Sequence, residues 1–124
     1  MITGVRSASV YVRDQDAALR FYTETPGFEL VQDTPMGEGA PRWIEVMPPD
    51  RQTLLVLFTA PGQEDRIGTF SNLLFACDDV RKTHEELVAR GVTFAEDPTE
   101  QFWGWWAVFQ DPDGNSYGLG QRGG

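Results

Sequence analysis

The residues that could support nucleophilic, acid–base or metal chemistry are few in this chain of 124 residues. It contains one His, His84, and one Cys, Cys77. An intrachain disulfide is therefore excluded, as are zinc sites that need several Cys or two His from one chain. His84 lies at helical spacing with Val80, Leu87 and Val88, which favours a packed imidazole over a catalytic one. Cys77 ends a predicted strand, and no neighbouring residue type would activate its thiol.

The charge balance narrows the possible partners. Ten Lys and Arg against 19 Asp and Glu give a formal net charge of −9. Such a chain repels phosphate backbones and anionic lipid, so we expect no nucleic acid and no membrane as a partner. No apolar run approaches the roughly 20 residues of a membrane span. The first residues do not resemble a signal peptide, and we expect a cytoplasmic protein.

The elements that must position these residues occur twice along the chain. Alternating and helical periodicities predict a first set of strand, helix and three strands at 7–12, 17–24, 28–33, 42–47 and 53–58. After a polar linker, 60–68, the same order is predicted at 72–77, 80–90, 92–95, 105–110 and 116–121. Asp14, and Asp78 or Asp79, are the expected helix N-caps. A loop with Asp97 and Pro98 is expected before the strand that begins at Trp105.

This repeat predicts an α+β fold. We expect one domain, residues 1–124, built from two βαβββ modules at about 3–59 and 69–121 that form a curved mixed sheet. Two such half-sheets, each backed by a helix, would enclose a concave cleft. A cleft of this kind is the default place for a ligand.

Three stretches carry a family resemblance: RDQDAALRFYTETPGFELV, DDVRKTHEELVARGVTF and WGWWAVFQDPDGNSYGL. Together they resemble the two modules of the vicinal oxygen chelate superfamily, which includes glyoxalase I, extradiol dioxygenases, fosfomycin-resistance transferases and bleomycin-resistance proteins. The superfamily's chemistry usually needs a divalent metal bound at four equivalent strand positions, usually by His or Glu. In this chain the resemblance places Ser7, Glu45, Asn72 and Gly118 at those positions.

That set of four residues argues against a metal. Glu45 is the one strong ligand, and Gly118 has no side chain, whereas transition metals need three or four fixed donors. We therefore expect no metal and no other cofactor. The resemblance then implies the metal-free bleomycin-resistance branch, whose members bind an antibiotic without reaction and are usually homodimers.

Strand alternation predicts which side chains share the cleft with the four positions. The predicted ligand-binding residues are Ser7, Ser9, Tyr11, Trp43, Glu45, Met47, Asn72, Leu74, Phe102, Trp103, Trp106 and Gly118. Adjacent Trp105 and Trp106 must point to opposite faces. We favour Trp106 for the cleft, although strand alternation alone leaves open which of the two faces it. Phe102 and Trp103, in the loop before them, could cover its mouth. Glu45 needs a partner for its carboxylate, which could be a ligand cation, Arg42, Arg6 or water.

These residues predict a small-molecule binding protein. We expect it to sequester an aromatic, natural-product antibiotic and so confer self-resistance, and the acidity of the chain favours a cationic ligand. Three alternatives stay open. One is a metal-free isomerase or lyase with Glu45 as its base. Another is a metal-dependent glyoxalase- or dioxygenase-like enzyme with ligands elsewhere, and the last is a domain without a single ligand that serves as a partner or stress protein.

Overall fold

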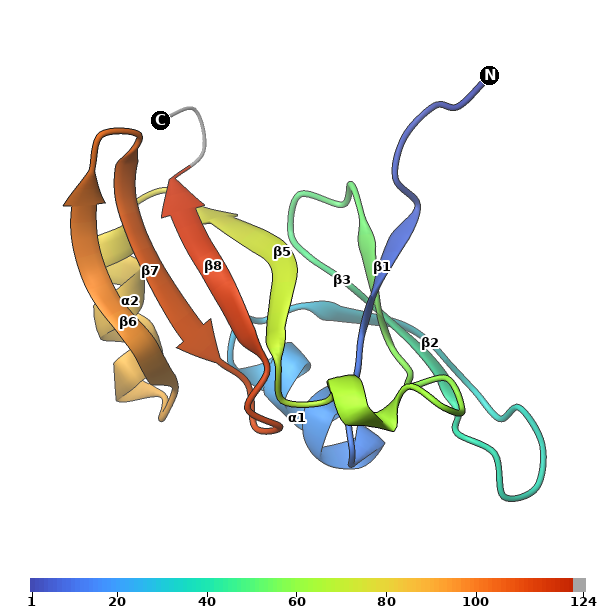
Figure 1. The fold of residues 1–124 in the computed structure, drawn as a ribbon. Helices are drawn as coiled ribbons and strands as arrows, with labels where there is room; N and C mark the ends of the chain where they lie inside the picture. The colour runs from blue at the N-terminus through green and yellow to red at the C-terminus, as the bar shows by residue number, and fades with distance from the viewer. Residues whose placement is uncertain (122–124) are drawn as a thin grey trace. The chain divides into compact units, whose positions relative to one another are not determined.

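The computed structural model describes residues 1–121, with the backbone alone for Asn72. The chain forms two compact units, residues 1–67 and the residues from 68 onward, and each has the predicted βαβββ order (Figure 1). The first unit contains β1 (Ser7–Val10), α1 (Gln15–Glu24), β2 (Glu29–Thr34), β3 (Trp43–Met47), β4 (Leu54–Leu57) and a 3₁₀ turn (Glu64–Arg66). The second contains β5 (Phe70–Cys77), α2 (Val80–Ala89), β6 (Thr93–Gln101), β7 (Gly104–Gln110) and β8 (Ser116–Gln121). The predicted α+β class is confirmed.

The two units share one sheet topology. The strand order is β1-β4-β3-β2 in the first sheet and β5-β8-β7-β6 in the second. In each sheet the first strand pairs in parallel with the last, and the other pairs are antiparallel. Both sheets are therefore mixed, and the repeat seen in the sequence is a repeat of connectivity.

A helix begins after an Asp cap in each unit. The Asp14 carboxylate accepts a hydrogen bond from the Ala17 amide at 3.0 Å, and the Asp79 carboxylate accepts one from the Lys82 amide at 3.1 Å. Asp79 is thus the cap of α2, which settles the choice between it and Asp78. Each helix covers one face of its own sheet, and the buried apolar side chains lie mainly on that face. The opposite face of each sheet is not covered by the helix of its own unit.

The prediction for the sixth strand is wrong. We expected a strand at 92–95 and a loop that contains Pro98, but β6 continues through Pro98 to Gln101. β6 is the edge strand of its sheet, where a missing amide donor is tolerated. Its pairing with β7 shifts register between Phe94 and Glu96 and again between Glu96 and Thr99. Pro98 therefore lies where the ladder is irregular and no regular backbone pairing is required of it.

The turn between β7 and β8 is organised around Asp111, which is 6% exposed. Its Oδ1 accepts hydrogen bonds from the amides of Asp113 and Asn115, both at 3.0 Å. Its Oδ2 accepts from Asn115 Nδ2 at 2.9 Å and from the Tyr117 hydroxyl at 3.2 Å. A buried carboxylate is tolerated when donors surround it in this way. Asp111 therefore has a structural role that fixes the start of β8.

Candidate functional site

Five predicted site residues of the first unit lie in its strands: Ser7 and Ser9 in β1, and Trp43, Glu45 and Met47 in β3. On β3, Trp43, Glu45 and Met47 alternate with the fully buried Ile44 and Val46, so the two sets point to opposite faces of the sheet. Ser9 and Glu45 both pair with Val56 of β4, so they lie in the same row across the sheet. The contact of these residues with a ligand stays a prediction.

Glu45 is the unusual residue of this face, because it is a carboxylate with 3% exposure in an inner strand. Its Oε2 accepts a hydrogen bond from Trp43 Nε1 at 3.0 Å and one from an Arg6 guanidinium nitrogen at 3.2 Å. The Trp43 ring packs against Phe58, with ring centroids 5.2 Å apart. Arg6 is thus the protein partner of Glu45. Arg42, the other candidate, pairs with Asp16 and Asp33 instead.

The second unit gathers its predicted residues around Gly118 of β8. A Cβ atom at this glycine would overlap Cη2 of Trp106 and would lie 2.9 Å from Cδ1 of Leu74. The indole therefore occupies the space that any side chain at residue 118 would need. Gly118 does not have a positive φ, so its backbone does not require glycine. The glycine is needed here because the Trp106 ring lies over it.

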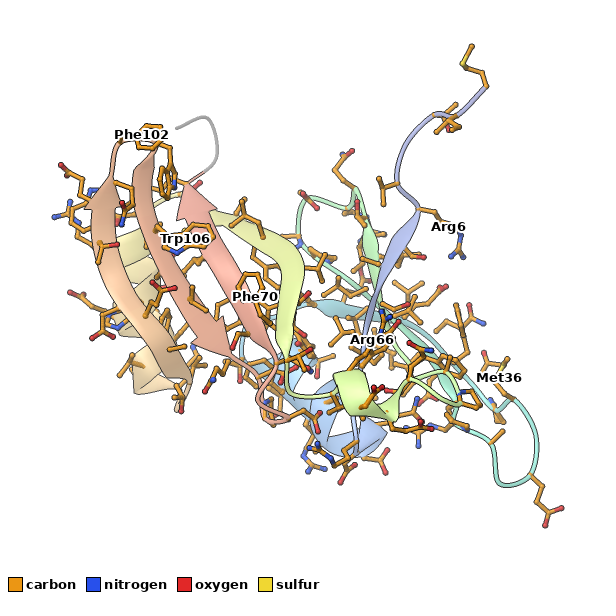
Figure 2. All side chains as sticks on the ribbon, viewed as in Figure 1. Arg6, Met36, Arg66, Phe70, Phe102 and Trp106 are labelled. Atoms are coloured by element: carbon orange, nitrogen blue, oxygen red, sulfur yellow. The ribbon has the colours of Figure 1, made fainter. Side chains whose placement is uncertain are left out.

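Trp105 and Trp106 point to opposite faces as predicted. The Arg81 guanidinium of α2 lies 4.4 Å from the Trp105 ring centroid, a cation–π contact on the helix side. Trp106 lies on the other side of β7 (Figure 2). Phe102 and Trp103 form the two-residue tip of the β6–β7 hairpin, since Gln101 pairs with Gly104.

The hairpin tip extends the aromatic surface beyond Trp106. The ring centroids of Trp103 and Trp106 are 6.4 Å apart, and those of Phe102 and Trp103 are 4.8 Å apart, both in edge-to-face orientation. Phe102 is 97% exposed and Trp103 54% exposed. Three aromatic side chains thus run from an open hairpin tip to the sheet face over Gly118. Large exposed aromatic surface of this kind is typical of binding sites.

Two predicted residues have a less defined place. Tyr11 follows the end of β1 at Val10, so strand alternation does not fix its direction. Asn72 lies in β5, but its side chain is outside the described residues. Each unit therefore assembles its own part of the predicted set: Trp43 and Glu45 in the first, Leu74 and the aromatic side chains around Gly118 in the second.

The residues at the four metal positions do not fit a metal. Among the described side chains, no group of three His, Cys, Asp or Glu lies close enough to bind one ion. Gly118 has no donor, and the Trp106 ring covers the place from which a donor would extend. Glu45 is already bonded to Trp43 and Arg6. A single carboxylate does not make a transition-metal site.

His84 and Cys77 are packed. The His84 ring meets Phe94 edge to face at 4.5 Å between centroids, and its Nε2 lies 3.4 Å from Asp97 Oδ1 at the surface. Burial raises the pKa of the Cys77 thiol above its ordinary value, and the carboxylates of Asp78 and Asp79 add to the rise. A thiol in this state is a poor nucleophile at neutral pH. Neither residue lies on the face that carries Trp106.

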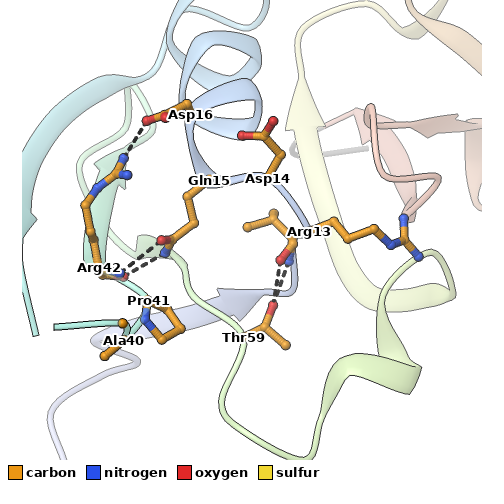
Figure 3. A pocket seen from close by; sticks show the side chains of 10 residues that line it. Arg13, Asp14, Gln15, Asp16, Ala40, Pro41, Arg42 and Thr59 are labelled. Atoms are coloured by element: carbon orange, nitrogen blue, oxygen red, sulfur yellow. Dashed lines mark hydrogen bonds and ion pairs between the residues drawn. The ribbon is translucent and has the colours of Figure 1, made fainter. Parts of the chain in front are cut away.

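A hollow of about 500 Å³ beside the start of α1 was not predicted from the sequence (Figure 3). It lies between the segments 12–16 and 39–42, with Thr59. The Gln15 amide there donates to the carbonyl oxygens of Arg42 and Leu57 at 2.7 and 2.8 Å, and accepts from the Arg42 amide at 2.9 Å. The Gln15 side chain thus connects the start of α1 to the backbone at Arg42 and Leu57. A glutamine directly after a helix cap does not predict such a contact from the sequence alone.

No helix in the described part of the chain is long and apolar enough to cross a membrane.

Comparison with known proteins gives one family. The model of the Glyoxalase/Bleomycin resistance protein/Dioxygenase superfamily matches residues 4–118. The uncharacterized protein YetH of Bacillus subtilis (strain 168) is 35% identical over 117 residues, which are 94% of this chain and 97% of YetH.

Two crystal structures are similar over nearly the whole chain. A member of the same superfamily from Sphaerobacter thermophilus DSM 20745 has a TM-score of 0.87 and 35% identity, with 98% of each chain covered. TnmS3, an antibiotic binding protein from Streptomyces sp. CB03234, has a TM-score of 0.81 and 39% identity, and the match covers 97% of this chain and 96% of TnmS3.

Proposed function

Because the chain belongs to the Glyoxalase/Bleomycin resistance protein/Dioxygenase superfamily, we propose that it binds a planar aromatic natural product without chemical reaction. The observation that carries this proposal is the Trp106 indole lying over Gly118, the residue that the family resemblance relates to a metal ligand. An aromatic face replaces a metal donor there. The function is then sequestration of an antibiotic, which keeps the compound from its target and confers self-resistance.

The aromatic surface supports a planar ligand. Stacking on aromatic rings favours flat partners, and each such ring contributes a large apolar area. Trp106, Trp103 and Phe102 supply adjoining rings in the second unit, and Trp43 with Phe58 supplies a pair in the first. The similarity to an antibiotic binding protein at 39% identity agrees with this class of ligand.

Absence of chemistry is supported by the state of the candidate groups. Burial raises the pKa of the Cys77 thiol, which keeps it protonated at neutral pH, and His84 is packed on Phe94. A general base needs a free path to the proton that it removes. We propose further that the protein acts as a homodimer, as the bleomycin-resistance branch implies, without any other cofactor or protein partner.

Fluorescence titration tests the proposal. We expect acridone, a neutral planar tricycle, to quench tryptophan emission saturably, and the change Trp106→Leu to weaken its binding at least about fivefold, since stacking contributes about 1–3 kcal/mol. Trp105→Leu is the matched control, because Trp105 lies on the helix side with Arg81. Recovery of unchanged compound after incubation, followed by chromatography, agrees with sequestration. Conversion of the compound, or equal effects of the two substitutions, would contradict it.

A further inference from the structure

Glu45 and Arg6 form an ion pair whose two members differ sharply in environment. The Glu45 side chain is 3% exposed and that of Arg6 is 70% exposed. Glu45 lies in β3, an inner strand, whereas Arg6 precedes β1 in the irregular N-terminal segment (Figure 2). A buried carboxylate is thus neutralised by a cation that remains largely in water.

Stability does not explain why a carboxylate occupies this position. Removing a carboxylate from water is costly, and a buried ion pair is often no more stable than apolar residues of similar size. Among the described residues, the other buried carboxylate is that of Asp111, and its turn explains it. The hydrogen bonds that the Glu45 carboxylate accepts come from the Trp43 and Arg6 side chains and not from backbone amides, so Glu45 does not hold a turn as Asp111 does.

The contact with Arg6 is of a kind that opens easily. A single guanidinium nitrogen meets a single oxygen, Oε2, at 3.2 Å, without the two parallel bonds that an arginine can make with a carboxylate. The Arg6 backbone is fixed, since its carbonyl accepts from the Leu54 amide at 3.1 Å. Because the Arg6 side chain is 70% exposed, it can swing into solvent while the strand stays in place.

The Trp43 contact has the opposite character. Its Nε1 donates to the same Oε2 at 3.0 Å, and its ring is packed against Phe58. This bond stays when Arg6 leaves, so the carboxylate remains oriented beside an aromatic pair. A carboxylate next to tryptophan and phenylalanine rings is the combination that recognises organic cations.

We propose that Arg6 is a displaceable counter-ion and that Glu45 is the recognition group for a cationic nitrogen on the ligand. The ligand class is then a planar aromatic compound with an amine or amidine-like cation, which takes the place of the Arg6 guanidinium at Oε2. This inference rests on the proposed function and names the ligand's charged group. The net charge of −9 attracts the same class of compound from solution.

A pair of probes with the same three rings tests it. 9-Aminoacridine is a cation at pH 7 and acridone is neutral. We expect the wild-type protein to bind 9-aminoacridine more tightly than acridone. Glu45→Gln should weaken 9-aminoacridine binding about tenfold or more, because hydrogen bonds to charged groups are the strong ones. The same change should alter the dissociation constant of acridone by no more than about twofold, as expected for a ligand that makes no ionic contact.

The Arg6 variant distinguishes a counter-ion from a ligand contact. Arg6→Gln removes the competitor, so we expect 9-aminoacridine to bind about two- to fivefold more tightly, because its cation no longer has to displace the single Arg6 hydrogen bond at Oε2. Arg20→Gln on α1 is the matched control: it removes one positive charge from another exposed side chain and should change both affinities little.

Each outcome separates this inference from the proposed function. If both probes bind equally and neither responds to Glu45→Gln, the counter-ion proposal is overturned and planar binding stands. Weaker 9-aminoacridine binding by Arg6→Gln also overturns it. If neither probe quenches tryptophan emission, both proposals fail. Far-UV circular dichroism on each variant confirms the fold, and Arg6→Gln changes an exposed side chain outside the strands.

Discussion

Replacement of Gly118 by alanine tests the central steric relation of the second unit. The added methyl would overlap Trp106 Cη2 and lie 2.9 Å from Leu74 Cδ1 and 3.0 Å from Trp106 Cζ3. The indole must therefore turn away, or the strands must separate. Overpacking of this kind costs about 1–3 kcal/mol. We expect Gly118→Ala to lower the free energy of unfolding by that amount.

Gly120→Ala is the matched control. Gly120 lies on the same strand and the same face, and an added Cβ would be 3.7 Å from Leu74 Cδ1, an ordinary contact. Alanine in place of glycine also reduces the freedom of the unfolded chain, by about 0.4–1 kcal/mol. We therefore expect Gly120→Ala to be neutral or slightly stabilising. The comparison separates the effect of the Trp106 ring from the general effect of a methyl group in β8.

Urea unfolding followed by circular dichroism measures both variants, and a double-mutant cycle identifies the partner. Trp106→Leu removes the ring that the methyl meets, so the double variant should be more stable than the sum of the single effects predicts. The Gly118→Ala protein should also bind acridone less well, because its stacking surface has moved. Equal stability of the two alanine variants, or strict additivity with Trp106→Leu, would refute the reasoning.

Three further predictions concern the groups around this surface. Gln15→Ala should lower the free energy of unfolding by about 1–3 kcal/mol, because the backbone groups of Arg42 and Leu57 lose their bonds; a urea midpoint within error of wild type would contradict this. Asp111→Ala should lower the free energy of unfolding by at least about 3 kcal/mol, because the donors that bind the Asp111 carboxylate lose their shared acceptor. Thermal unfolding measures this change. Alkylation of Cys77 by iodoacetamide should be slow at pH 7, and its rate should rise with pH without levelling off below about pH 9, because burial raises the pKa of the thiol above its ordinary value of 9.0; fast reaction at pH 7, or a rate that levels off below about pH 9, would disprove that.

Much of the fold could be predicted because its signals are local. Alternation of apolar residues marks the strands, and an Asp at each helix start marks the caps, so the repeated βαβββ order was visible before any tertiary contact was known. The opposite directions of Trp105 and Trp106 were predictable for the same reason, because the two residues are neighbours in a strand. Which of them faces the helix could not be predicted from alternation, and the contact of Trp105 with Arg81 of α2 answers it.

The features that escaped prediction depend on distant residues. β6 could continue through Pro98 because it lies at the edge of the sheet, and an edge position is a property of topology that no short stretch reveals. Arg6 and Glu45 are 39 residues apart. The sequence offers Arg42 equally as a partner for Glu45, whereas in the structure Arg42 pairs with Asp16 and Asp33. Alternation predicts a face, but it does not predict which long side chain reaches across it.

Glu45 on β3 and Gly118 on β8 are two of the positions that the family resemblance relates to metal ligands, and they differ in character. Glu45 carries a charge, is paired with an exposed arginine and accepts a hydrogen bond from an indole. Gly118 has no side-chain donor, and the Trp106 ring fills the space beside it. One unit therefore offers electrostatic recognition and the other offers a stacking surface. Return of a donor at residue 118 would require the loss of Trp106, so the stacking surface and a metal ligand exclude one another at that strand.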